Sequence, residues 1–205
     1  MQLLGGFLSP YVRRTAVSLN LMGLEYESVK VPVWDTPEEV QKHNPLVRIP
    51  TVVLDDGEVL VESYAILDAL DEMAGDKRLT PANGTARRDV MKVTAVGAGT
   101  IDKTIWAVYE LRFHDKEHVS RSWVEHNENQ ALGGFSWLND LAAKSGDGWL
   151  CGANITQADV TAAVGFSFAN KVRPKLDLAN KFPALAAHNA KAEALDAFQN
   201  APIPS

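Results

Sequence analysis

The sequence predicts two domains: an α/β domain over residues 1–75 and an all-helical domain over residues 85–205, joined by a linker at residues 76–84. Three observations support this division. Apolar runs that suit strands alternate with helical patterns in the first part of the chain. A polar run containing Pro and Asn then interrupts all periodicity. Beyond this run, apolar residues recur only at helical spacing, so no further strand is expected.

A β-α-β unit is expected to open the first domain. Apolar pairs within residues 3–8 predict a strand. Ser9 suits the N-cap of the following helix, Pro10 suits its first position and Gly23 suits its end. Alternating valines over residues 29–33 predict the second strand.

A short helix, a β-hairpin and a third helix should complete this domain. Thr36 suits the N-cap of the short helix. An Asp-Gly pair between the apolar runs at residues 51–54 and 59–61 favours a tight hairpin. Ser63 can cap the third helix.

The second domain is expected to contain four main helices, over residues 87–113, 120–143, 157–171 and 184–194. Thr156 and Asp159 have the spacing of a capping box at the start of the third of these helices, which predicts a structural role for both. Gly97 and Gly99 lack the context of a dinucleotide-binding motif, and we expect them to let two helices pack closely.

Composition excludes several classes of protein. The chain has 205 residues, a net charge of −6 and 46% hydrophobic residues, which is enough apolar material for a folded core. It has neither a basic run nor a stretch of ~20 apolar residues, so we expect no nucleic-acid partner and no membrane partner. No His-Glu-x-x-His spacing or cysteine cluster indicates a metal, and none is expected. The single cysteine, Cys151, and the absence of a signal-peptide pattern favour a cytoplasmic location.

Ser9 is the first candidate for chemistry because of its expected place at a helix start. Backbone N–H groups and the positive end of the helix dipole stabilise an anion there, including a thiolate. Taken alone, the position is explained more simply by helix capping.

Two further motifs make a family resemblance specific. Residues 44–50 read N-P-L-V-R-I-P, and residues 62–63 are an E-S pair that opens a helix. With Ser9, these motifs resemble the glutathione-binding half of the glutathione transferases in order and spacing. Residues 135–152 and 182–187 resemble the second domain of that family. The resemblance implies a thioredoxin-like first domain, a cis bond before Pro50 and glutathione as co-substrate.

The resemblance also implies a role for each motif residue. The cis bond before Pro50 would turn the backbone of Ile49 outward, ready to pair with the cysteinyl backbone of glutathione. Ser63 would bind the γ-glutamyl carboxylate, and Glu62 would accept from the neighbouring ammonium. Arg48 would pair with the glycyl carboxylate. Weaker candidates for this last contact are Lys42 and His43.

The catalytic residue implied is Ser9. Family members activate the sulfur of glutathione with Tyr, Ser or Cys, and here Phe7 stands at the tyrosine position. A serine hydroxyl can only hydrogen-bond the sulfur, which favours conjugation over thiol-disulfide exchange. Cys151 is an alternative nucleophile, but most isolated cysteines are small buried hydrophobic residues.

The second substrate is expected to be a hydrophobic electrophile, and the reaction a detoxification. Tyr11, Trp106, Tyr109 and Phe113 are candidates to line its pocket, although aromatic residues at helical spacing more often pack in a core. Two alternatives stay open: a non-catalytic binding or regulatory protein of the same fold, and a glutathione-dependent isomerase or dehalogenase. A homodimer is expected from the resemblance.

Overall fold

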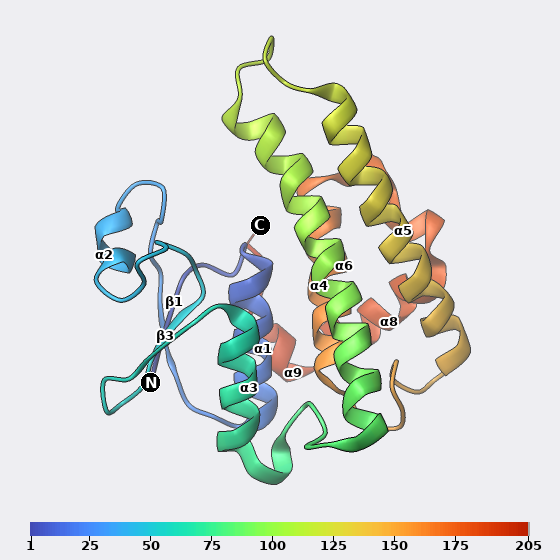
Figure 1. Ribbon diagram of the computed structural model, residues 1–205. Helices are drawn as coiled ribbons and strands as arrows, with labels where there is room; N and C mark the ends of the chain where they lie inside the picture. The colour runs from blue at the N-terminus through green and yellow to red at the C-terminus, as the bar shows by residue number, and fades with distance from the viewer. Residues whose placement is uncertain (205) are drawn as a thin grey trace. The chain divides into compact units, whose positions relative to one another are not determined.

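The computed structural model describes residues 1–204 and divides the chain into two units (Figure 1). The first unit contains Met1–Pro81 together with residues 194–204, and the second contains Ala82–Glu193. The first combines a mixed sheet with helices and the second is helical, which confirms the predicted fold class.

A four-stranded sheet in the order β2-β1-β3-β4 forms the frame of the first unit. β1 and β2 are parallel, whereas β3 is antiparallel to both β1 and β4. The strands are β1 (Gln2–Leu4), β2 (Glu27–Val29), β3 (Thr51–Val53) and β4 (Val59–Val61). The predicted Asp-Gly hairpin between β3 and β4 is therefore confirmed.

Two helices pack side by side against this sheet, as Figure 1 shows. α1 (Pro10–Met22) buries Val12, Ala16 and Leu19, and α3 (Ser63–Ala74) buries Ile66 and Leu70. Gly23 ends α1 in the left-handed conformation with φ of 70°, as its sequence position suggested. The unit also contains α2 (Pro37–Gln41), the 3-10 helix η1 (Gly75–Lys77) and α9 (Asp196–Gln199).

The carboxyl-terminal segment belongs to the first unit. Arg13 Nε donates to Ala201 O at 2.8 Å, and Asn20 Nδ2 donates to Ala197 O at 2.8 Å. Phe198 of this segment is fully buried, with the Arg13 guanidinium over its ring. We expected the second domain to span residues 85–205; residues 194–204 instead group with the first unit because α1 holds their backbone, and residue 205 lies outside the described residues.

Glycines allow close helix packing in the second unit. A Cβ atom at Gly134 of α5 would lie 1.9 Å from Thr100 Oγ1 of α4, and one at Gly97 of α4 would lie 3.1 Å from Thr161 Cγ2 of α6. The expected packing role thus holds for Gly97 but not for Gly99, which is exposed with open space beside it. The helices are α4 (Gly84–Phe113), α5 (Arg121–Ser145), α6 (Gln157–Val172), the 3-10 helix η2 (Pro174–Leu176), α7 (Leu178–Lys181) and α8 (Pro183–Glu193). No helix within residues 1–204 is long and apolar enough to cross a membrane.

Asp159 is the buried polar centre of the second unit. Its Oδ2 accepts from Thr156 N and Thr156 Oγ1, both at 2.8 Å, which confirms the predicted capping box. Its Oδ1 accepts from Leu150 N at 2.7 Å and lies 2.9 Å from His188 Nε2. One carboxylate therefore joins the start of α6, the loop before it and α8.

Two local predictions were wrong, and a third was confirmed only in its position. The first strand ends at Leu4 rather than at residue 8, because Gly5 turns the chain at φ of 126°. Thr36 stands at the N-cap of α2, as predicted, but its side chain makes no capping hydrogen bond. Glu62 occupies the N-cap of α3, so Ser63 is the first helical residue rather than the cap.

We expect Asp159→Asn to lower the free energy of unfolding by roughly 3 kcal/mol, because an amide nitrogen would replace a buried acceptor that faces several donors. Urea denaturation measures this loss. Asp140→Asn, an exposed carboxylate on α5, is the matched control and should change little. A loss below about 1 kcal/mol for Asp159→Asn would contradict this central role.

Candidate functional site

Three segments of the first unit meet at Gly5. A Cβ atom at this position would lie 2.6 Å from Val12 Cγ2 in α1 and 3.0 Å from Ile49 Cβ in the loop before β3. Gly5 N also donates to Val29 O of β2 at 2.9 Å. The missing side chain therefore brings the start of α1 close to the loop that precedes β3.

Ser9 stands at the N-cap of α1, as the sequence predicts. Val12 N donates to Ser9 Oγ at 3.4 Å, and Arg13 N donates to Ser9 O at 2.9 Å. Ser9 is half-buried. Because its oxygen accepts the capping bond, the hydroxyl hydrogen can still be donated to another atom. The side chain thus combines a hydroxyl donor with the positive end of a helix.

The loop at residues 44–51 is held by two buried side chains that sequence reasoning missed. Asn44 Nδ2 donates to Arg48 O at 3.0 Å and to Thr51 Oγ1 at 3.2 Å. Thr51 Oγ1 donates to the same Arg48 O at 3.0 Å. Asn44 Oδ1 accepts from Leu46 N at 2.9 Å, which closes an Asx turn. Asn44 and Thr51 flank the Pro residues of this loop in the sequence, but no local pattern indicated that their side chains hydrogen-bond each other.

The backbone of this loop has two unusual features. The Ile49–Pro50 bond is cis, as the family resemblance implied. Val47 has φ of 54°, a region that favours glycine.

Charged side chains lie close together at the start of α3. Arg48 Nη1 is 2.9 Å from Glu62 Oε1, and both side chains are partly exposed. Glu62 has φ of 63° and ψ of 122°, a conformation that non-glycine residues rarely adopt and that is concentrated at functional sites. Ser63 follows it, buried, in the first turn of α3. Arg48 and Glu62, expected at opposite ends of glutathione, thus contact each other.

The weaker candidates for the glycyl contact have other surroundings. Lys42 Nζ donates to both carboxylate oxygens of Glu39 at 2.8 Å, within the first unit. His43 is half-buried, with its backbone N–H donating to Val40 O.

Three of the predicted substrate residues lie on one face of α4. Trp106 is 53% exposed, Tyr109 39% and Phe113 47%. The rings of Tyr109 and Phe113 contact edge to face, with centroids 5.2 Å apart. They are therefore not part of the helical core, in contrast to the usual expectation for aromatic residues at this spacing. Tyr11, in the first turn of α1, is half-buried.

Cys151 has the surroundings of an unreactive thiol. Burial, followed by the negative charges of Asp159 and Asp89, raises its pKa from 9.0 to about 11. A thiol is nucleophilic only as the thiolate, so Cys151 is a poor nucleophile at neutral pH. Within residues 1–204 no cluster of His, Cys, Asp and Glu suits a metal ion.

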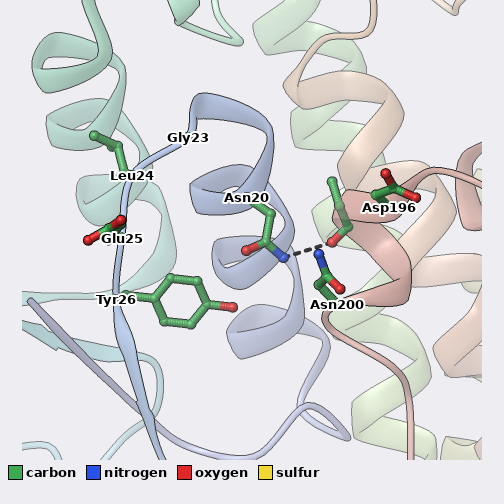
Figure 2. A pocket seen from close by; sticks show the side chains of 8 residues that line it. Asn20, Gly23, Leu24, Glu25, Tyr26, Asp196 and Asn200 are labelled. Atoms are coloured by element: carbon green, nitrogen blue, oxygen red, sulfur yellow. Dashed lines mark hydrogen bonds between the residues drawn. The ribbon is translucent and has the colours of Figure 1, made fainter.

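A separate hollow lies at the other end of α1 (Figure 2). It has a volume of about 540 Å³ and is lined by Asn20, Gly23, Leu24, Glu25, Tyr26, Asp196, Ala197 and Asn200. Burial raises the pKa of the Tyr26 phenol, and the nearby Asn20 side chain acts in the opposite direction. None of the motif residues lines this hollow, so it is not the candidate site.

Sequence comparison identifies the family to which these motifs belong. The family model described as the N-terminal domain of glutathione S-transferase matches residues 8–73, and the C-terminal domain model matches residues 121–188. The chain therefore belongs to the glutathione S-transferase family. Maleylacetoacetate isomerase of Pseudomonas aeruginosa is 30% identical over 191 residues, covering 83% of this chain and 87% of the isomerase.

Solved structures of the family have the same fold. A glutathione S-transferase of Methylobacterium radiotolerans in complex with glutathione sulfonate has a TM-score of 0.90 and 27% identity, covering 100% of this chain and 95% of its own. One of Methylobacillus flagellatus with glutathione bound has a TM-score of 0.91 and 27% identity, covering 98% of each chain. Both of these similar proteins were thus solved with glutathione or a glutathione derivative.

Gly5→Ala is expected to lower the stability of the protein by more than about 2 kcal/mol, because the new methyl group would meet Val12 and Ile49 in a backbone conformation unfavourable to alanine. Urea denaturation measures the change. Gly57→Ala is the matched control, since Gly57 also has a positive φ, 92°, but has open space around it. It should lose only about 1 kcal/mol, and equal losses in the two variants would contradict the packing argument.

The Cys151 thiol should react slowly with iodoacetamide at pH 8. A pKa of about 11 in place of 9.0 leaves about a hundredfold less thiolate than in the unfolded chain. Because the pKa is raised, the rate should keep increasing about tenfold per pH unit until the pH approaches that value. The same chain unfolded in urea is the control; equal rates in the two states would contradict the assigned surroundings.

Proposed function

We propose that the protein is a glutathione S-transferase that conjugates the thiolate of glutathione to hydrophobic electrophiles, with Ser9 stabilising the thiolate. The observation that carries the proposal is the N-cap hydroxyl of Ser9 at the start of α1, a helix whose Val12 approaches Ile49 of the cis-Pro50 loop at Gly5. The glutathione ligands in the two similar solved structures support it.

Glutathione would be held mainly by backbone groups of the first unit. The N–H and C=O of Ile49 would pair with the cysteinyl residue as an added strand does. Ser63, in the first turn of α3, offers its hydroxyl and N–H to the γ-glutamyl carboxylate. Glu62 would accept from the ammonium next to that carboxylate.

In the proposed complex, Glu62 and the glycyl carboxylate of glutathione would compete for Arg48. In the free protein it lies against Glu62, 2.9 Å away. Binding the glycyl carboxylate would require its side chain to leave Glu62. An exposed ion pair contributes roughly 0–1 kcal/mol, so this exchange is energetically easy.

The chemistry assigned to Ser9 is hydrogen bonding to the sulfur. A free thiol has a pKa of roughly 8.5, and each unit by which it falls corresponds to about 1.4 kcal/mol. The hydroxyl donor and the helix N-terminus both favour the thiolate over the thiol. Holding the electrophile next to this sulfur would supply the rest of the acceleration.

The second substrate is assigned to aromatic side chains. Trp106, Tyr109 and Phe113 offer an exposed apolar face on α4. Such a face suits an apolar or aromatic electrophile. An apolar electrophile as second substrate fits a detoxifying conjugation, which we place in the cytoplasm. We also expect the protein to be a homodimer in solution, from its family resemblance.

A glutathione-dependent isomerase is the second candidate. The 30% identity with a maleylacetoacetate isomerase over 83% of this chain favours it. An isomerase would use the same bound thiolate but regenerate glutathione at the end of each turnover. Product analysis with an aryl halide and with maleylacetoacetate separates the two reactions, and binding without turnover of either would favour a non-catalytic protein.

Ser9→Ala should bind glutathione but conjugate it roughly 10- to 100-fold more slowly, the range expected when a charged group loses one hydrogen bond. The ultraviolet absorbance of bound thiolate should appear about one to two pH units higher, since the pKa of the sulfur rises. Calorimetry, turnover and the absorbance titration measure these three quantities.

Ser9→Thr retains the hydroxyl and the helix cap, so it should restore most of the activity. Ser136→Ala, an exposed serine on α5, controls for serine loss in general. Unchanged turnover and titration in Ser9→Ala would refute the role of Ser9, whereas the absence of glutathione binding to the wild-type protein would refute the proposed function.

A further inference from the structure

The carbonyl of Arg48 accepts hydrogen bonds from two fully buried side chains. Asn44 Nδ2 and Thr51 Oγ1 each donate to it at 3.0 Å. Asn44 Nδ2 also lies 3.2 Å from Thr51 Oγ1, so the three polar atoms form a compact triangle. Asn44 and Thr51 have no exposed surface, so neither can touch a ligand directly.

This network also sets the direction of the next N–H group. Arg48 and Ile49 share one peptide unit, which is trans, since the cis bond lies after Ile49. In a planar trans peptide the C=O and the N–H point in opposite directions. A carbonyl of Arg48 directed into the buried Asn44–Thr51 pair therefore requires the Ile49 N–H to point away from that pair.

We infer that Asn44 and Thr51 are positioning residues, which aim the Ile49 N–H at the cysteinyl backbone of glutathione. The inference rests on the proposed function and adds to it two residues that act only through the Arg48–Ile49 peptide. Thr51 is well placed for this, because it also begins β3 and pairs with Leu4 of β1 and Val61 of β4. Strand pairing therefore holds the Thr51 backbone in place, and the Thr51 hydroxyl in turn holds the Arg48–Ile49 peptide.

A merely structural role for the network has a different signature. It would lower stability without changing how the Ile49 N–H meets glutathione. The test therefore follows that single amide by hydrogen exchange in ¹⁵N NMR spectra, with and without saturating glutathione. Turnover and calorimetry on the same samples give the Kd of glutathione and kcat.

Thr51→Val is the main variant, because valine keeps the shape and strand preference of threonine but removes the hydroxyl. In the wild-type protein, glutathione should slow exchange of the Ile49 amide at least about tenfold. In Thr51→Val this protection should be largely lost, and the Kd should rise about tenfold, the value of one net hydrogen bond. The kcat at saturating glutathione should change less than about twofold, because Ser9 is not altered.

Thr51→Ser retains the hydroxyl and should keep both the protection and the affinity. Thr161→Val removes an equally buried threonine hydroxyl from α6 and should leave both unchanged. If Thr51→Val does not fold, Thr51→Ala supplies the same measurements with a smaller side chain.

The outcomes distinguish failure of the proposed function from failure of the positioning role of Asn44 and Thr51. If the wild-type protein does not bind glutathione, the proposed function fails and this inference fails with it. If it binds glutathione but the Ile49 amide gains no protection, or if Thr51→Val and Thr51→Ala retain the protection and the affinity, the inference is overturned and the proposed function stands.

Discussion

The absence of a side chain at Gly5 is the constraint on which the candidate site depends. Val12 of α1 and Ile49 of the loop before β3 both occupy space that a Cβ atom would need. Ser9 and the Ile49 backbone lie on these two segments. In the proposed site, one glutathione molecule would place its thiolate at the start of α1 and its backbone along the loop before β3. It can reach both only if the two segments lie close together. Gly5 permits that approach.

Each unit fixes an irregular loop with a buried polar group that is fully paired. In the first unit this group is the Arg48 carbonyl, held by Asn44 and Thr51. In the second it is the carboxylate of Asp159, held by Thr156, Leu150 and His188. Buried polar groups are tolerated when all their hydrogen bonds are made, and they then define one geometry for the loop.

Local signals predicted most of the fold and part of the site. The Ser9 cap, the Asp-Gly hairpin and the Thr156 capping box depend on residues close in sequence, and the structure contains all three. Contacts between distant residues were missed, because a single sequence does not reveal which segments meet. The Arg48–Glu62 pair and the return of residues 194–204 to α1 belong to this group. The shift of the N-cap from Ser63 to Glu62 was missed because it needs a rare backbone conformation.

The position of residues 194–204 in the first unit has a consequence for biosynthesis. The ribosome delivers residues 82–193 before it delivers Ala197 and Ala201, whose carbonyl oxygens accept from Asn20 and Arg13. The contacts between α1 and residues 194–204 therefore cannot form until the entire helical unit has emerged from the exit tunnel, and this surface of α1 stays uncovered until then. Domains generally fold in the order of their synthesis; in this chain the part made first is the part completed last.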